Sequence, residues 1–452
     1  MLLDWAIGGF RVSGFGFRDE RADASPCIDS DGGTLPVSWS TRVSLRSSRC
    51  PASRIQDHQS LPPGDTLPGK PHPTSRISHP ASHIPHLASH ISYPVSPIPS
   101  NARILIFRMG HLGDILHLMP TVREMRRQRP GWKLELVTGP WSKALAESFG
   151  LFDAIHEYCP DVVQYHRGNR HSVRSAAEEK AFIIGIRGSG VDLVFCPNAP
   201  HFCELPLVVG LGAERYVGAP WPMDEVPPPL ESATKPFNSR QYEMDAVADF
   251  LPMMGLERPG VKLAYPLTAP AREKARDWVK EHVPDGRLVL IFPGSGWPGK
   301  NWPPDSFARL ADELIQKEGV SIGLCGSPAE VPLCKQISHW MEADAHILAG
   351  QFALDEMAAL MRHSLCVIGN DSAPIHIAAA LDIPTVSLWG PTFPEKWAPR
   401  GSAHQQVMVV DCCEGCLYWH VKASCRRDSG CMASVRDEDV LHAAQHVLKT
   451  LT

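Results

Sequence analysis

The segment RMGHLGD (108–114) contains the first candidate for catalysis, the carboxylate of Asp114. It follows the apolar run 103–107, which has strand length, and precedes residues 115–128, where apolar residues recur at helical spacing. Its two glycines permit a tight turn and close approach by a ligand. A carboxylate at the carboxyl end of such a strand is placed to take a proton from an attacking hydroxyl group. The alternative is structural, because Asp is also a favoured helix N-cap.

A second segment, FPGSGWPGKNWP (292–303), has the composition of an anion-binding loop. Its glycines leave room for phosphate oxygens, to which Ser295 and nearby backbone N–H groups can donate. Lys300 supplies a positive charge suited to a diphosphate leaving group. The pattern is not a Walker motif, and a structural loop with a solvated lysine is the alternative.

The third segment, GNDSAPIHIAAALDIPTVSLWGPTFPEKW (369–397), places polar side chains at the end of a predicted strand. Asp371 and Ser372 lie where a helix is expected to begin, so they and its free N–H groups point into a ligand cleft. His376 follows Ser372 by about one helical turn, which puts both on one face. Taken alone, His376 is also compatible with a buried core histidine, whereas the group together indicates a ligand site.

The elements that carry these segments alternate between strand and helix. One series runs from residue 103 to the apolar strand at 192–196, and a second runs from the strand at 287–292 to that at 384–390. Such alternation predicts parallel sheets with right-handed crossovers. We therefore expect an α/β protein with two doubly wound, Rossmann-like domains and a ligand cleft between them.

The three segments, in this order and spacing, resemble glycosyltransferase family 9, the heptosyltransferase family, over about residues 102–450. The resemblance implies a GT-B fold and transfer with inversion at the sugar. It also implies an ADP-activated heptose as the donor and the lipopolysaccharide core, a lipid-linked saccharide, as the acceptor. No cofactor or metal is expected, and the cleft segments contain no D-x-D triad.

The resemblance assigns roles to particular residues. Asp114 matches the proposed base, and Lys300 matches the lysine that meets the donor diphosphate. The donor motif and the ribose-contacting glutamate of the family correspond to Asp371, Ser372, His376 and Glu330. The chain departs from the family at Ala373, where glycine is usual, and in the first motif, which commonly carries serines near Met109 and Gly110.

The domain organisation follows from composition and from the pattern of elements. Residues 1–100 are rich in Pro, Ser and His and are expected to be disordered. Residues 101–265 are the expected acceptor-side domain and 266–452 the nucleotide-sugar domain. The net charge of −5 gives no pull toward nucleic acid. No long apolar run or signal peptide is evident, so we expect a cytoplasmic protein, with peripheral contact to the inner face of the cell membrane left open.

Five cysteines cluster near the C-terminus, with spacing that resembles a metal site. They are Cys412, Cys413, Cys416, Cys425 and Cys431. Structural zinc and a loop with reduced thiols remain alternatives.

Three other functions compete with heptosyl transfer. One is a family member with a different donor or acceptor sugar, another a nucleotide-sugar epimerase, and the third a non-catalytic saccharide-binding protein. Nucleotide release measured with and without an acceptor separates them, because an epimerase turns over its donor alone. The set Asp114, Lys300, Asp371 and His376 argues against a degenerate site.

Overall fold

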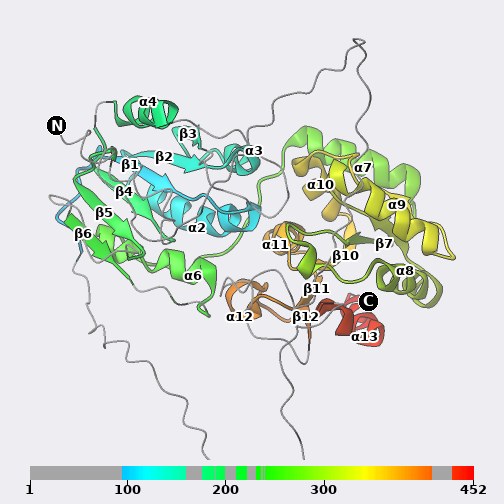
Figure 1. The fold of residues 1–452 in the computed structure, drawn as a ribbon. Helices are drawn as coiled ribbons and strands as arrows, with labels where there is room; N and C mark the ends of the chain where they lie inside the picture. The colour runs from blue at the N-terminus through cyan, green and yellow to red at the C-terminus, as the bar shows by residue number, and fades with distance from the viewer. Residues whose placement is uncertain are drawn as a thin grey trace, which may run out of the picture. The chain divides into compact units, whose positions relative to one another are not determined.

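The computed structural model describes residues 94–158, 176–188, 190–198, 210–220, 231–235, 238, 240–409 and 430–451. In this part of the chain, two six-stranded sheets form, and every strand pair in them is parallel. Figure 1 shows helices packed around each sheet. The predicted α/β class is confirmed. Most of the predicted disordered segment, residues 1–93, lies outside the described residues.

The first sheet has the strand order β3-β2-β1-β4-β5-β6. Its strands are β1 (Arg103–Phe107), β2 (Lys133–Thr138), β3 (Ala154–Glu157), β4 (Leu193–Cys196), β5 (Arg215–Gly218) and β6 (Glu231–Thr234). Its helices are α2 (Leu112–Gln128), α3 (Pro140–Ser148), α4 (Ala176–Arg187) and α6 (Glu243–Ala248). The strand order reverses beside β1, so the turn after β1 opens at a topological switch point, where doubly wound sheets bind ligands.

The second sheet repeats this topology in the order β12-β11-β10-β7-β8-β9. Its strands are β7 (Leu288–Phe292), β8 (Ser321–Leu324), β9 (His346–Ile347), β10 (Ser364–Asn370), β11 (Thr385–Trp389) and β12 (His404–Met408). Its helices are α7 (Ala269–His282), α8 (Pro304–Glu318), α9 (Val331–Trp340), α10 (Leu354–Met361), α11 (Ala373–Ala380), α12 (Pro394–Trp397) and α13 (Asp437–Lys449). The switch point lies between β7 and β10, so the loops after these two strands meet there.

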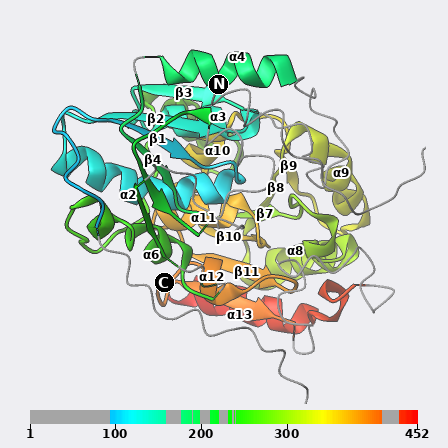
Figure 2. The ribbon, with the colours of Figure 1, turned by 60° about the vertical axis from the view of Figure 1, so that its left-hand side comes forward.

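The central strands β4 and β7 are apolar throughout, as expected for parallel strands covered on both faces. All five residues of β7 are buried. One hydrophobic cluster includes residues of both sheets and of α2 and α11. Helix α2 packs directly against α11, and Figure 2 shows the two side by side.

One predicted helix is shorter than the sequence pattern indicates. Helical spacing extends over residues 241–255, but α6 ends at Ala248 and a 3₁₀ turn, Leu251–Met254, follows it. Pro252 has no backbone N–H to continue an α-helix. Gly255 then closes the turn in the left-handed region, with φ of 68°.

The ordered fold begins before the expected boundary at residue 100. Val95 is buried in the main hydrophobic cluster, and its backbone N–H donates to the Met253 carbonyl at 3.1 Å. Ser96 donates from its backbone and its hydroxyl to the two carboxylate oxygens of Glu231, both at 2.6 Å. The short Pro- and Ser-containing sequence does not reveal these contacts, since they depend on partners more than a hundred residues away.

These contacts predict where the chain can be shortened. A chain that begins at Tyr93 is expected to keep the unfolding midpoint and the activity of the full-length protein. One that begins at Asn101 loses the burial of Val95 and the Ser96–Glu231 bonds, so we expect it to be about 1–3 kcal/mol less stable. Urea-induced unfolding measures the difference, and Val95→Ala in the full-length chain is the control for the apolar part. Equal midpoints for the two shortened chains contradict this prediction.

Candidate active site

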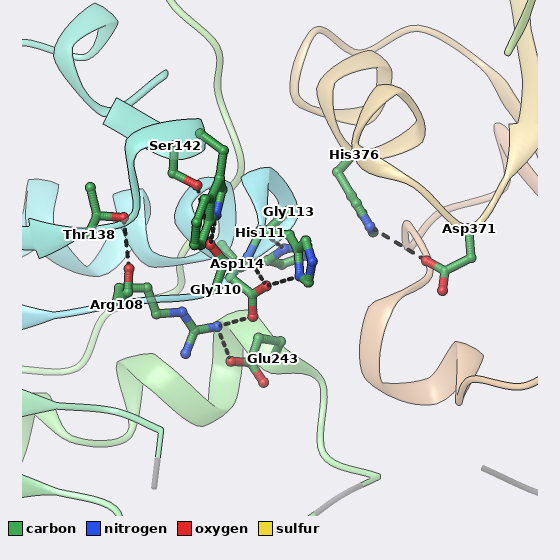
Figure 3. A network of polar contacts seen from close by, with 12 residues as sticks. Arg108, Gly110, His111, Gly113, Asp114, Thr138, Ser142, Glu243, Asp371 and His376 are labelled. Carbon is green, nitrogen blue, oxygen red and sulfur yellow. Dashed lines mark hydrogen bonds and ion pairs between the residues drawn. The ribbon is translucent and has the colours of Figure 1, made fainter. Parts of the chain in front are cut away.

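Asp114 lies in the first turn of α2, as its third residue. The expected alternative, a helix N-cap, is wrong in position, because His111 is the N-cap. The carboxylate nevertheless caps the helix from within its first turn, because its Oδ2 accepts the His111 backbone N–H at 2.8 Å. Its Oδ1 accepts a hydrogen bond from Arg108 Nη2 at 2.9 Å (Figure 3). A Cβ at Gly110 would lie 2.3 Å from the Asp114 Cγ, so only glycine permits this fold of the turn.

A line of buried charges extends from Asp114 into the protein. Arg108 directly follows β1 and is 1% exposed. Its Nη2 also contacts Glu243 Oε1, at 2.5 Å, and the other oxygen of Glu243 pairs with Lys396 Nζ at 2.5 Å. Burial alone would raise the pKa of Glu243, but Arg108 and Lys396 hold it at about 2. Glu243 is therefore ionised between two cations.

Asp371 is the centre of a second polar group, after β10. It is buried, and its Oδ2 accepts from Lys300 Nζ at 2.9 Å and from the Thr392 hydroxyl at 2.8 Å. Burial opposes ionisation of Asp371, but the charge of Lys300 and these hydrogen bonds lower its pKa overall. The structure therefore brings together Lys300 and Asp371, which the sequence places on separate loops.

Asn370 fixes both ends of the glycine-rich loop. Its side-chain N–H donates to the Pro293 carbonyl at 2.7 Å, and its Oδ1 accepts the Trp302 backbone N–H at 3.0 Å. Inside the loop, the Ser295 hydroxyl lies 2.6 Å from Asn301 Oδ1 and 2.7 Å from the Trp297 carbonyl oxygen. Ser295 thus holds the turn that presents Lys300, rather than pointing away from the loop.

Two further predicted residues lie beside this loop. Glu330 Oε2 accepts from the backbone N–H and the hydroxyl of Ser327, both at 2.7 Å. A Cβ at Gly294 would lie 1.9 Å from Glu330 Oε1, so the carboxylate borders the loop directly. Ser372 is the N-cap residue of α11, and its hydroxyl donates to the Asn370 carbonyl at 3.2 Å.

His376 connects the two polar groups through helix packing. Its ring lies 3.1 Å from the position of a Cβ at Gly113, and its centroid lies 4.8 Å from that of His117. Its Nε2 is 3.9 Å from Asp371 Oδ1. Burial, with His117 adding to it, lowers the pKa of His376 to about 3, so the imidazole is neutral. Figure 3 shows His376 and Asp371 across from Asp114.

The described residues do not hold an evident metal site. Among them, no group of three or more His, Cys, Asp or Glu side chains is arranged to bind a metal ion. Cys431 is buried, whereas Cys412, Cys413, Cys416 and Cys425 lie outside the described residues. Within the same part of the chain, no helix is both long and apolar enough to span a membrane.

Comparisons with known proteins identify the family of this chain. The model of glycosyltransferase family 9 (heptosyltransferase) matches residues 239–421. Lipooligosaccharide heptosyltransferase 2 of Haemophilus influenzae is 35% identical over 328 residues, which are 68% of this chain and 89% of that protein. The chain belongs to glycosyltransferase family 9. Lipopolysaccharide heptosyltransferase 1 of Pseudomonas aeruginosa is 27% identical over 322 residues, covering 70% of this chain and 86% of its own length.

Solved structures of family 9 proteins share the fold. A family 9 glycosyl transferase from Veillonella parvula has a TM-score of 0.64 at 21% identity, covering 77% of this chain and 98% of its own. The Escherichia coli ADP-heptose LPS heptosyltransferase II has a TM-score of 0.58 at 16% identity, covering 77% and 99%. The predicted GT-B fold, the family and the glycosyltransferase class are confirmed.

The sequence patterns did not indicate several residues of this candidate site in the family 9 chain. Arg108, His117, Asn370 and Lys396 stand inside or beside the motifs, but nothing in their spacing indicates their partners. Glu243 lies in a helix with no motif at all. Its contact with Arg108 spans 135 positions of sequence, and no local pattern indicates it.

The buried state of His376 predicts how stability depends on pH. An unfolded histidine binds a proton below about pH 6.5, whereas folded His376 remains neutral down to about pH 3. Below about pH 6.5 the unfolded state takes up a proton at this histidine and the folded state does not. The free energy of unfolding is therefore unaffected by His376 above about pH 6.5 and decreases as the pH falls below it. Between pH 7.5 and pH 5, the wild type is expected to lose about 2 kcal/mol more than His376→Gln.

Urea-induced unfolding at the two pH values measures this difference. His339→Gln removes an exposed histidine and is the control. If His376→Gln loses as much stability as the wild type, another group is responsible.

Proposed function

We propose that this glycosyltransferase moves a heptose from ADP-heptose to the lipopolysaccharide core, with Asp114 as the base. The observation that supports it most is the packing of α2 against α11. This packing brings the turn after β1, which carries Asp114, close to the turn after β10, which carries Asp371. The relatives named above are heptosyltransferases of lipopolysaccharide or lipooligosaccharide, and the E. coli structure is that of an ADP-heptose LPS heptosyltransferase.

The proposed reaction is a single displacement. Asp114 takes the proton of an acceptor hydroxyl as its oxygen bonds to the anomeric carbon. The bond from that carbon to the ADP oxygen breaks on the opposite face, ADP leaves with the electron pair, and the configuration inverts. Asp114 retains lone pairs for this proton, because each carboxylate oxygen has two and accepts one hydrogen bond in the structure.

The growing charge on ADP requires positive groups. Lys300 and the N-terminus of α11 are the candidates. Asp371 holds Lys300 Nζ in place while it neutralises part of its charge. Glu330, beside Gly294, is the candidate for a ribose contact, and Ser295, Ser372 and His376 complete the proposed donor site.

The proposed acceptor is a lipid-linked saccharide. An enzyme that adds sugars to such an acceptor works at the membrane surface, so we propose a cytoplasmic enzyme with peripheral contact to the inner face of the membrane. In this proposal, residues 101–265 form the acceptor side and residues 266–452 the nucleotide-sugar side.

Asp114→Asn tests the proposed base. The amide cannot take the proton, so transfer is expected to fall about 10²- to 10⁴-fold while ADP-heptose binding persists. Asn can accept from only one of Arg108 and His111, so we also expect a stability loss of about 1 kcal/mol. Transfer is measured as ADP release with and without the acceptor, and binding by calorimetry.

The matched control for this variant is Glu356→Gln. Glu356 is the corresponding capping carboxylate of α10, where it accepts the Ala353 backbone N–H at 2.7 Å. It is expected to lose similar stability and to keep transfer. Asp114→Asn with transfer within a few-fold of wild type means that the base lies elsewhere. Conversion of the ADP-sugar to its epimer by the wild type without an acceptor favours an epimerase.

Lys300→Ala tests the diphosphate contact. Loss of one charge-assisted contact is worth about 1.5–3 kcal/mol, so we expect donor affinity and turnover to fall together, by about 10- to 100-fold. Lys262→Ala, which removes an exposed lysine paired with Asp382, is the control. Unchanged kinetics in Lys300→Ala contradict the assignment.

A further inference from the structure

We propose that Glu243 is a positioning residue that sets the basicity of Asp114 through the guanidinium of Arg108, which the two carboxylates share. The inference rests on the proposed function, in which Asp114 is the base. It adds Glu243 and Lys396 to the residues on which transfer depends. Glu243 lies in no motif, and Lys396 lies near the end of the third motif, whose pattern assigns it no role.

The sharing occurs at a single atom. Arg108 Nη2 lies 2.9 Å from Asp114 Oδ1 and 2.5 Å from Glu243 Oε1. The other guanidinium nitrogens, Nε and Nη1, are buried without a hydrogen-bond partner among the described residues. The two carboxylates therefore compete for one cation, and a stronger bond to one weakens the bond to the other.

The fourth member, Lys396, sets how much of Glu243 is available to Arg108. Its Nζ pairs with the second oxygen of Glu243. The charges along the line alternate from Asp114 to Lys396 and sum to zero. The side chains of Arg108, Glu243 and Lys396 are 0%, 2% and 3% exposed. Water screens such charges poorly, so a change at the inner end reaches the outer one.

Other polar groups face the same line. His111 Nδ1 lies 4.0 Å from Asp114 Oδ2. His117 is fully buried and close enough to interact electrostatically with Asp114, Arg108 and Glu243, and burial lowers its pKa. The Cys196 thiol also lies near Arg108. The charges of Glu243 and Lys396 control Asp114 more directly than these groups, because a chain of ion pairs through Arg108 connects them to it.

The two inner residues are expected to act in opposite directions. In Glu243→Gln, Asp114 is the one carboxylate among the described residues that still pairs with Arg108. The positive charge then stabilises ionised Asp114 more strongly, which makes Asp114 a weaker base. In Lys396→Met, Glu243 binds Arg108 with its full charge, which makes Asp114 more basic. A purely structural role for these residues predicts lost stability in both variants, with no such opposition.

The test is the pH dependence of kcat/KM, with ADP-heptose and a heptose-deficient lipopolysaccharide core as substrates. The acid limb reports the ionisation of the base in the free enzyme. We expect it to move by about one pH unit to lower pH in Glu243→Gln and by a similar amount to higher pH in Lys396→Met.

Glu135→Gln is the matched control. Glu135 pairs with Arg103 and His156 at the opposite end of β1, with Arg103 Nε 2.8 Å from its carboxylate. The variant removes the same charge from a similar network away from Asp114. It is expected to lose stability and to leave the acid limb in place.

Asp114→Asn, measured beside these variants, separates the two proposals. If it transfers like the wild type, the proposed base is wrong. If it abolishes transfer while Glu243→Gln and Lys396→Met leave the acid limb unmoved, or move it in one direction, only the role of Glu243 is overturned. Should Glu243→Gln fail to fold, the shift in Lys396→Met decides, since methionine fills much of the buried volume of lysine.

Discussion

The close packing of α2 on α11 at Gly113 is the constraint on which the proposed site depends. The imidazole of His376 lies 3.1 Å from where a Cβ at Gly113 would stand, so a side chain there would have to displace the ring. Because Asp114 is the next residue and Asp371 lies one turn before His376, this one contact sets the spacing between the carboxylate and the Lys300 group. Each sheet holds its switch point beside this contact between α2 and α11.

The charges around the contact are paired rather than free. Lys300 lies against Asp371, and Arg108 lies between Asp114 and Glu243. Buried ion pairs contribute little net stability, since desolvation offsets their attraction, but removing one partner costs about 3–5 kcal/mol. Besides any electrostatic effect on Asp114, these pairs give each charged group a fixed position before any substrate binds.

Much of this arrangement follows from the sequence. Alternating apolar strands and helical periods predict two doubly wound sheets, and the motifs fall at the ends of β1, β7 and β10, where such sheets bind ligands. The residues of the three motifs are therefore found at the two switch points. The local sequence pattern was sufficient to locate these residues, because the motif residues directly follow strands that can be recognised from their apolar sequence.

The features that the sequence did not predict depend on contacts between segments that are far apart in the chain. Asp114 is recognisable as a capping residue, but its position inside the helix depends on where the first turn begins. Glu243 has no motif, and its partners lie directly after β1 and on α12. Val95 belongs to a Pro-rich stretch that looks polar, yet it is buried because Met253 and its neighbours provide an apolar surface.

The two hydrogen bonds of the Asn370 side chain fix both ends of the glycine-rich loop. Pro293 and Trp302 cannot move apart or together without breaking a buried bond. Whatever adjustment a ligand requires is confined to the span between them, which carries Ser295 and Lys300. A single asparagine at the end of β10 therefore sets the distance between the two ends of the loop that carries Ser295 and Lys300.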